Sequence, residues 1–243
     1  MLTLFWKEVG SFLNSLIGYI VITVFLLING LFLWVFESDF NILDYGYASL
    51  DGLFMVAPFV FLFLIPAITM RSFADERKSG TIEMLLTKPL TDLEIILAKY
   101  FAGFVLVIFS VLPTLVYFFS VYQLGTPKGN LDIGGMWGSY IGLLFLGASF
   151  VAIGIFSSSI TNNPIISFIL AVFLSLIFYI GFDFIYSLDL FGSIDLLVKS
   201  LGINAHYTSM SRGVIDTRDL IYFVSLIAFF VLLTKLSLES RKW

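Results

Sequence analysis

Residues able to carry out catalysis or to bind metal ions are scarce in this sequence. It has no cysteine and a single histidine, His206, which excludes disulfides, thiol nucleophiles and a histidine cluster within one chain. The Gly-x-x-x-x-Gly-Lys-Ser/Thr loop that holds nucleotide phosphates is also missing. We therefore expect no catalytic residue, no metal site and no cofactor held by this chain. His206 is expected to act as a hydrogen-bonding residue.

The most informative chemistry lies in the polar segment between residues 71 and 99. Gly80 is suited to end one helix, because glycine readily adopts the left-handed conformation found at helix C-termini. Thr91 and Glu94 have the spacing of a capping box, which starts another helix. The residues between them favour a short helix over 81–87, and Pro89 stops it.

This predicted short helix has charged flanks and an apolar centre at Leu85 and Leu86. Two interpretations are open. Such a helix can dock a soluble partner, with Glu83 accepting hydrogen bonds, or its leucines can pack back onto the rest of the chain. Glu76 is expected to orient the helix or to pair with Arg77.

The polar segment 71–99 lies between long apolar stretches, which are expected to form the helices that hold it in place. Of 243 residues, 59% are hydrophobic and only 12% are charged, whereas an average soluble protein has about 25% charged residues. A helix of about 20 apolar residues crosses a bilayer, and the continuous runs favour helices over barrel strands. We therefore expect an all-α integral membrane protein, one transmembrane domain over residues 1–243, with spans at 15–36, 53–70, 100–122, 139–156, 164–182 and 220–236.

The distribution of lysine and arginine predicts the orientation, because cytoplasmic loops carry an excess of both. Six spans place the two termini, segment 71–99 and segment 157–163 on one side, with nine of the 13 basic residues. The other side has only Lys128, Lys199, Arg212 and Arg218. Both termini are therefore expected to be cytoplasmic. Nucleic-acid binding has no support, because the net charge is −4 and the basic residues are scattered along the sequence.

Two further segments are predicted to be helical and associated with the bilayer. Apolar residues at helical spacing in segment 1–14 predict an interfacial helix, interrupted by Gly10 and Asn14, although this segment can also extend the first span. The outer segment 183–219 predicts two short helices dipping into the membrane, with a plain surface loop as the alternative. The first is capped by Ser193 and closed by Gly202, and the second covers 204–212 before Gly213.

Small and polar residues inside the spans are candidates for helix contacts. The pairs Gly138/Gly142 and Ala148/Ala152 place small residues along the fourth span, which favours close packing of helices within the chain. Asn29 is the strongly polar side chain deep in the first span. It faces either a neighbouring helix or a translocation path.

The segment Glu76…Gly80-Thr81-Ile82-Glu83-x-Leu85-Leu86-x-x-Pro89-Leu90 resembles the coupling segment of type-2 ABC transporter permeases. The N-terminal helix, the six spans and the outer segment ending in Gly202-Ile-Asn-Ala-His-Tyr are also similar to that family. Within it, the chain resembles the permease subunit of the gliding-motility ABC transporter of Bacteroidetes.

This resemblance implies a subunit of an ATP-driven exporter in the cell inner membrane. Cytoplasmic ABC ATPase subunits would bind ATP and Mg, and a second permease chain would complete a homo- or heterodimer. A subunit with a large outer domain is a further possible partner, as in a mechanotransmission or anchoring complex that transports nothing. An intramembrane enzyme and a secondary transporter are disfavoured, because the span centres lack ionisable residues.

The predicted topology can be tested with introduced cysteines, because the natural chain has none. Single cysteines at Ser38, Lys128 and Ser193 should react with an impermeant thiol reagent added to sealed cells. A cysteine at Ser79 should react only after the cells are opened. Labelling of Ser79 in sealed cells would contradict the orientation.

Overall fold

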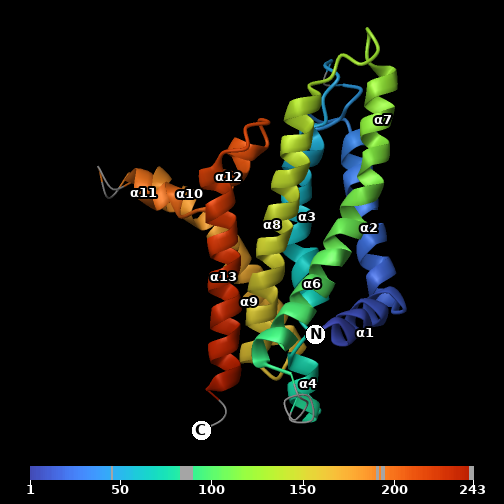
Figure 1. The fold of residues 1–243 in the computed structure, drawn as a ribbon. Helices are drawn as coiled ribbons and strands as arrows, with labels where there is room; N and C mark the ends of the chain where they lie inside the picture. The colour runs from blue at the N-terminus through green and yellow to red at the C-terminus, as the bar shows by residue number, and fades with distance from the viewer. Residues whose placement is uncertain (45, 83–89, 190–191, 193–194, 241–243) are drawn as a thin grey trace.

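The computed structural model describes residues 1–44, 46–82, 90–189, 192 and 195–240. Within them, six helical segments are long and apolar enough to cross a membrane, which confirms the predicted all-α fold: Leu16–Trp34, Asp51–Lys78, Asp92–Leu124, Ile133–Ile160, Pro164–Ser187 and Thr217–Glu239. The N-terminal helix and the end of the last helix lie at the same end of the bundle (Figure 1). That end also carries α4, so we call it the α4 end.

The helices in chain order are α1 Leu2–Leu13, α2 Leu16–Trp34, α3 Asp51–Thr69, α4 Ala74–Lys78, α6 Asp92–Val111, α7 Leu115–Leu124, α8 Ile133–Ile160, α9 Pro164–Leu176, α10 Phe182–Ser187, α11 Asp195–Ser200, α12 Ile203–Met210 and α13 Thr217–Glu239.

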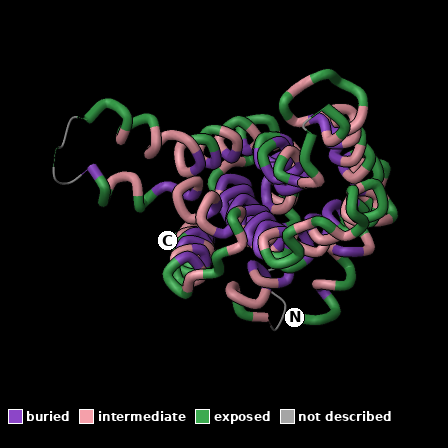
Figure 2. The backbone as a smooth tube through the Cα atoms, turned by 90° about the horizontal axis from the view of Figure 1, so that it is seen from above, coloured by how far each residue is buried: buried purple, intermediate pink, exposed green. Residues whose placement is uncertain are grey.

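Helix α8 forms the centre of the bundle and packs against α3, α6, α9 and α13. Figure 2 shows buried residues in the middle of the bundle, with exposed residues around the rim. Glycines allow this close packing. A Cβ atom on Gly147 would lie only 2.6 Å from Val107 Cγ1, and one on Gly154 would overlap the side chain of Thr69.

Two spans differ from the continuous helices predicted for 100–122 and 164–182. The first is interrupted by a 3₁₀ turn at Leu112–Thr114, because Pro113 lacks the N–H group that continues an α-helix. The second does not end at Phe182. It passes through a π-helical turn, Ile177–Gly181, and continues as α10 to Ser187.

Segment 1–14 forms a helix distinct from the first span. Helix α1 runs through Gly10, which therefore does not interrupt it as predicted. The break comes at Asn14 and Ser15, where the Ser15 hydroxyl accepts a hydrogen bond from Gly18 N at 3.4 Å and caps α2. α1 then lies across the end of α2 (Figure 1).

In the segment from residue 183 onward, the described residues form α10, α11, α12 and the start of α13, with turns and coil between them. α10 and α11 project sideways from the bundle, and α12 turns back along it (Figures 1 and 2). Gly202 follows α11, and its N–H donates to Lys199 O at 3.0 Å. It does not adopt the left-handed conformation of a C-terminal glycine cap, because it has φ −81° and directly precedes α12. Gly213, by contrast, adopts φ +82° shortly after α12, and the proposed cap Ser193 lies outside the described residues.

A tyrosine ties α12 to α3 where a proline leaves a backbone acceptor free. Pro58 lies inside α3 and has no N–H group for the carbonyl of Phe54, four residues earlier. The buried Tyr207 hydroxyl donates a hydrogen bond to that carbonyl at 2.7 Å. The tyrosine thus supplies the hydrogen bond that the Phe54 carbonyl lacks because of the proline. In an apolar environment, backbone polar groups must find such partners within the protein.

Tyr207→Phe should therefore destabilise the protein by about 1–3 kcal/mol, the cost of leaving a buried acceptor unpaired. Thermal unfolding in detergent measures the effect. Tyr222→Phe is the matched control, because the Tyr222 hydroxyl donates to Leu201 O at an exposed site. Equal stability of Tyr207→Phe and the natural protein would contradict this role.

Candidate functional site

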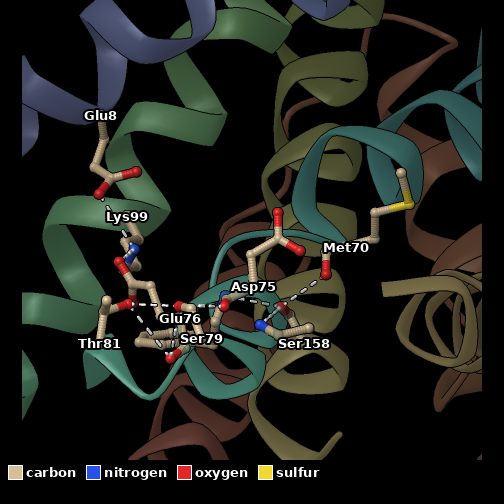
Figure 3. Close-up of polar contacts among 10 residues, drawn as sticks. Glu8, Met70, Asp75, Glu76, Ser79, Thr81, Lys99 and Ser158 are labelled. Atoms are coloured by element: carbon tan, nitrogen blue, oxygen red, sulfur yellow. Dashed lines mark hydrogen bonds and ion pairs between the residues drawn. The ribbon is translucent and has the colours of Figure 1, made fainter. Parts of the chain in front are cut away.

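A buried lysine joins three helices at the α4 end. Lys99 of α6 has a side chain only 2% exposed, and its Nζ lies 2.8 Å from Glu76 Oε1 of α4 and 3.2 Å from Glu8 Oε1 of α1. The ammonium group also lies 5.1 Å from the ring centroid of Phe73. Figure 3 shows both carboxylates pointing toward Lys99 from different helices. We call Lys99, Glu8 and Glu76 the ion triad.

This arrangement corrects the prediction that Glu76 can pair with Arg77. Successive residues on a helix point in different directions, and Glu76 instead reaches a lysine 23 positions further along the chain. One ammonium faces two carboxylates, and Glu76 Oε2 is buried with no hydrogen-bond partner among the described residues. Two carboxylates therefore share one cation.

A second connection ties α4 to the centre of the bundle. Ser158 of α8 is fully buried. Its hydroxyl accepts hydrogen bonds from Phe73 N and Ala74 N at 2.9 and 3.0 Å, and donates to Met70 O at 3.0 Å (Figure 3). The Ser158 side chain thus forms hydrogen bonds with two N–H groups and one carbonyl of the backbone between α3 and α4, where the regular hydrogen bonds of a helix are lost.

The turn after α4 is closed by hydroxyl groups. Ser79 Oγ lies 2.8 Å from both Asp75 O and Thr81 Oγ1, and Gly80 adopts φ +71°. Thr81 and Ile82 are helical again. The other predicted site residues of this segment, Glu83, Leu85, Leu86 and Pro89, lie outside the described residues.

Beside this turn, a surface cavity of about 740 Å³ lies between two loops that are distant in sequence. One wall comes from the end of α4 and the turn after it, and includes Arg77, Gly80 and Ile82. The other comes from the connection between α8 and α9, from Ile160 to Ile166. The Arg77 Nε–H group, a hydrogen-bond donor, is buried with no partner among the described residues. It is therefore available to an acceptor group of another molecule.

The described residues contain no group of histidine, aspartate and glutamate side chains that can hold a metal ion. The α4 end instead offers mechanical connections. The ion triad binds α4 to α1 and α6, and Ser158 binds it to α8. A force applied to α4 therefore acts on three other helices.

Comparison with known families gives one match. The sequence profile of the ABC-2 family transporter proteins covers residues 2–238, almost the whole chain. The chain belongs to this family. It is therefore a membrane-spanning permease subunit of an ABC transporter, a type of subunit that works with an ABC ATPase and as one of two permease chains. No curated protein matches the permease.

The predicted packing residues of the permease all lie on α8. Gly138 faces the end of α12, where a Cβ atom would lie 2.7 Å from Gly213 Cα, and Gly142 faces Met210 at 3.0 Å. Ala148 and Ala152 are buried further along α8. These contacts are made within the chain.

Two polar residues that the sequence left without a defined partner are now placed. Asn29 is fully buried in the bundle, and its Nδ2 donates to Phe25 O at 2.8 Å. His206 contacts Asp219 Oδ1 at 2.6 Å and Ser200 O at 2.9 Å, and it stacks on Tyr222. His206 thus joins α11, α12 and α13 through hydrogen bonds.

Sequence reasoning missed Glu8, Lys99 and Ser158 as parts of the site. Glu8 lies in the predicted interfacial segment 1–14 and Lys99 at the end of segment 71–99, and neither was given a partner. Ser158 lies in segment 157–163, between two predicted spans, whereas α8 continues to Ile160. A lysine seven residues inside a helix that enters the membrane was the available signal, because such a charge requires a partner.

Lys99→Met should destabilise the permease by about 3 kcal/mol or more, because two carboxylates lose their buried cation. The variant carrying Lys99→Met, Glu8→Gln and Glu76→Gln together should recover much of this loss, since no charge remains in the triad. Unfolding in detergent provides the measurement, and Lys7→Met, at an exposed position of α1, is the control. Normal stability of Lys99→Met would show that the triad contributes little.

Proposed function

We propose that this permease belongs to an ATP-driven exporter of the cell inner membrane and that its α4 end faces the cytoplasm. There, α4 and the segment after it, residues 81–89, would receive the movement of a separate ATPase that binds ATP and Mg. The observation that carries the proposal is the ion triad, which fixes α4 to α1 and α6.

The triad and Ser158 explain how a local push can move the membrane helices together. α4 continues from α3, and Lys99 lies near the start of α6, so both membrane helices adjoining the segment are held to it. Ser158 adds α8, the central helix. Movement of α4 would then be passed on as rigid-body motion of packed helices rather than absorbed by a loose loop.

The cavity between Arg77 and Ile166 is the proposed docking surface for the ATPase. Its apolar residues, including Ile160 and Ile166, lie beside polar and charged ones. This mixture is typical of an interface with a soluble partner. The predicted helix with Glu83, Leu85 and Leu86 adjoins this surface in sequence.

The likeness of Glu76-Arg77-Lys78-x-Gly80-Thr81-Ile82-Glu83 to gliding-motility permeases supports a link to gliding motility. In that setting, a partner subunit with a large outer domain can receive the movement. The complex would contain two permease chains, identical or different. Identification of the proteins that co-purify with the chain in mild detergent tests this assembly, and absence of any ABC ATPase would contradict it.

Thr81→Arg and Asn162→Arg should weaken binding of the ATPase by more than about thirtyfold, because an unpaired charge in a docked interface costs about 2–5 kcal/mol. Both positions are exposed, and Asn162 lines the cavity, so Asn162→Arg should leave folding unaffected. Thr81→Arg also removes the hydroxyl that contacts Ser79 Oγ, so its unfolding in detergent is measured as well. Glu83→Arg extends the test to the segment outside the described residues. Pull-down of the ATPase and stimulated ATP hydrolysis are measured together.

Ser240→Arg is the matched control. Ser240 is an exposed, uncharged residue at the end of α13 and does not line the cavity. The substitution adds the same charge at the same end of the bundle, and it should leave ATPase binding unchanged. If Thr81→Arg and Asn162→Arg bind and stimulate the ATPase like the control, this surface is not the coupling site.

A further inference from the structure

A large cavity opens at the opposite end of the bundle from the ion triad, which we call the outer end. Its volume is about 1260 Å³. The outer half of α3, the start of α8, the π-helical turn and α12 contribute to its walls. Neither the coupling contacts nor the packing of α8 requires such a space.

One wall of this cavity is an apolar stripe on α3. Met55, Phe59 and Phe63 are 57%, 52% and 55% exposed, although α3 is otherwise one of the most buried helices of the bundle. Their spacing of four residues places them on one helix face. From Met55 to Phe63 the stripe extends about 12 Å along the helix, at 1.5 Å per residue.

Another part of the cavity lining is polar. Asn204, Thr208 and Arg212 are spaced by four residues along and just beyond α12, and all three line the cavity. Asn204 Nδ2 donates to Asp183 Oδ2 at 2.6 Å. These four residues also line a second cavity of about 540 Å³, to which Lys199 is added. The two cavities therefore share a polar wall.

The smaller cavity carries an excess of positive charge. Lys199 and Arg212 face a single carboxylate, Asp183, which already accepts the hydrogen bond from Asn204. Neither cation forms an ion pair with a residue in the described part of the chain, although Lys199 lies 4.8 Å from the ring centroid of Tyr186. The acidic Asp51 and Asp132 line the larger cavity and not the smaller one.

We propose that the paired cavities bind one anionic phospholipid of the outer leaflet. Its phosphate group lies between Lys199 and Arg212, and an acyl chain lies along Met55, Phe59 and Phe63. α3 starts at Asp51 at the outer end and runs inward, so the apolar stripe lies deeper in the membrane than this end of the helix. This order of head and tail matches a lipid of the outer leaflet. The site deepens the proposed function, because it names the class of molecule that the permease accepts at its outer end.

The test uses the full-length permease in nanodiscs that contain phosphatidylglycerol and phosphatidylcholine, without the ATPase. Lipid retained after extraction is measured by native mass spectrometry. Lys199→Ala with Arg212→Ala should lower retention of phosphatidylglycerol by about thirtyfold, since each basic residue near an anionic lipid contributes about fivefold. The control carries Lys128→Ala and Arg218→Ala, which remove two exposed outer charges that line neither cavity.

Three outcomes would overturn the proposal: unchanged retention in the cavity variant, equal loss in the control, or equal retention of phosphatidylcholine by the natural protein. Phe63→Trp should reduce retention by filling the apolar wall while leaving both cations in place. A cysteine introduced at Met55 tests whether a second copy occupies the cavity instead, because the copies would then form a disulfide with each other. Since the ATPase is absent, failure here leaves the coupling site untouched.

Discussion

The placement of a positive charge at the edge of an apolar bundle is the constraint on which the α4 end depends. Lys99 is buried, and an unpaired buried ammonium group is costly. It must therefore be met by carboxylates, which come from Glu8 of α1 and Glu76 of α4 at 3.2 and 2.8 Å. This requirement fixes the N-terminal helix and the short α4 against the same membrane helix. The element proposed to receive the ATPase movement is thereby part of the bundle rather than an appended loop.

Backbone hydrogen-bonding groups are under a similar constraint, because no water is available to them inside the bundle. Where helices are interrupted inside the bundle, hydrogen-bonding groups lose their regular partners and must find others within the protein. Ser158 supplies them between α3 and α4, and Tyr207 supplies one opposite Pro58 in α3. In both cases a side chain from a distant part of the sequence closes the gap. Breaks in helices are therefore also points where helices are tied together.

These connections relate the two ends of the molecule. α3 and α8 both extend from the outer cavity to the α4 end, and glycines on α8 allow them to pack closely. α8 contributes Ser139 to the outer cavity and Ser158 to the contacts with α4. Because both helices are packed along their lengths, the proposed coupling would carry a shift at the α4 end toward the proposed lipid site. The geometry is suited to coupling.

The sequence by itself determined the membrane fold, because runs of about 20 apolar residues have few other stable environments. It also determined local features that depend on neighbouring residues, such as the Thr91–Glu94 capping box. Tertiary structure decided which charges and hydroxyls meet. Glu8 and Lys99 are separated by 91 positions, and no local pattern relates them. The π-helical turn and the passage of α9 into α10 were likewise missed, because a polar residue such as Asp183 resembles a span end until its partner Asn204 is placed beside it. The outer cavity belongs to the same class of feature, since its walls come from helices that only the fold brings together.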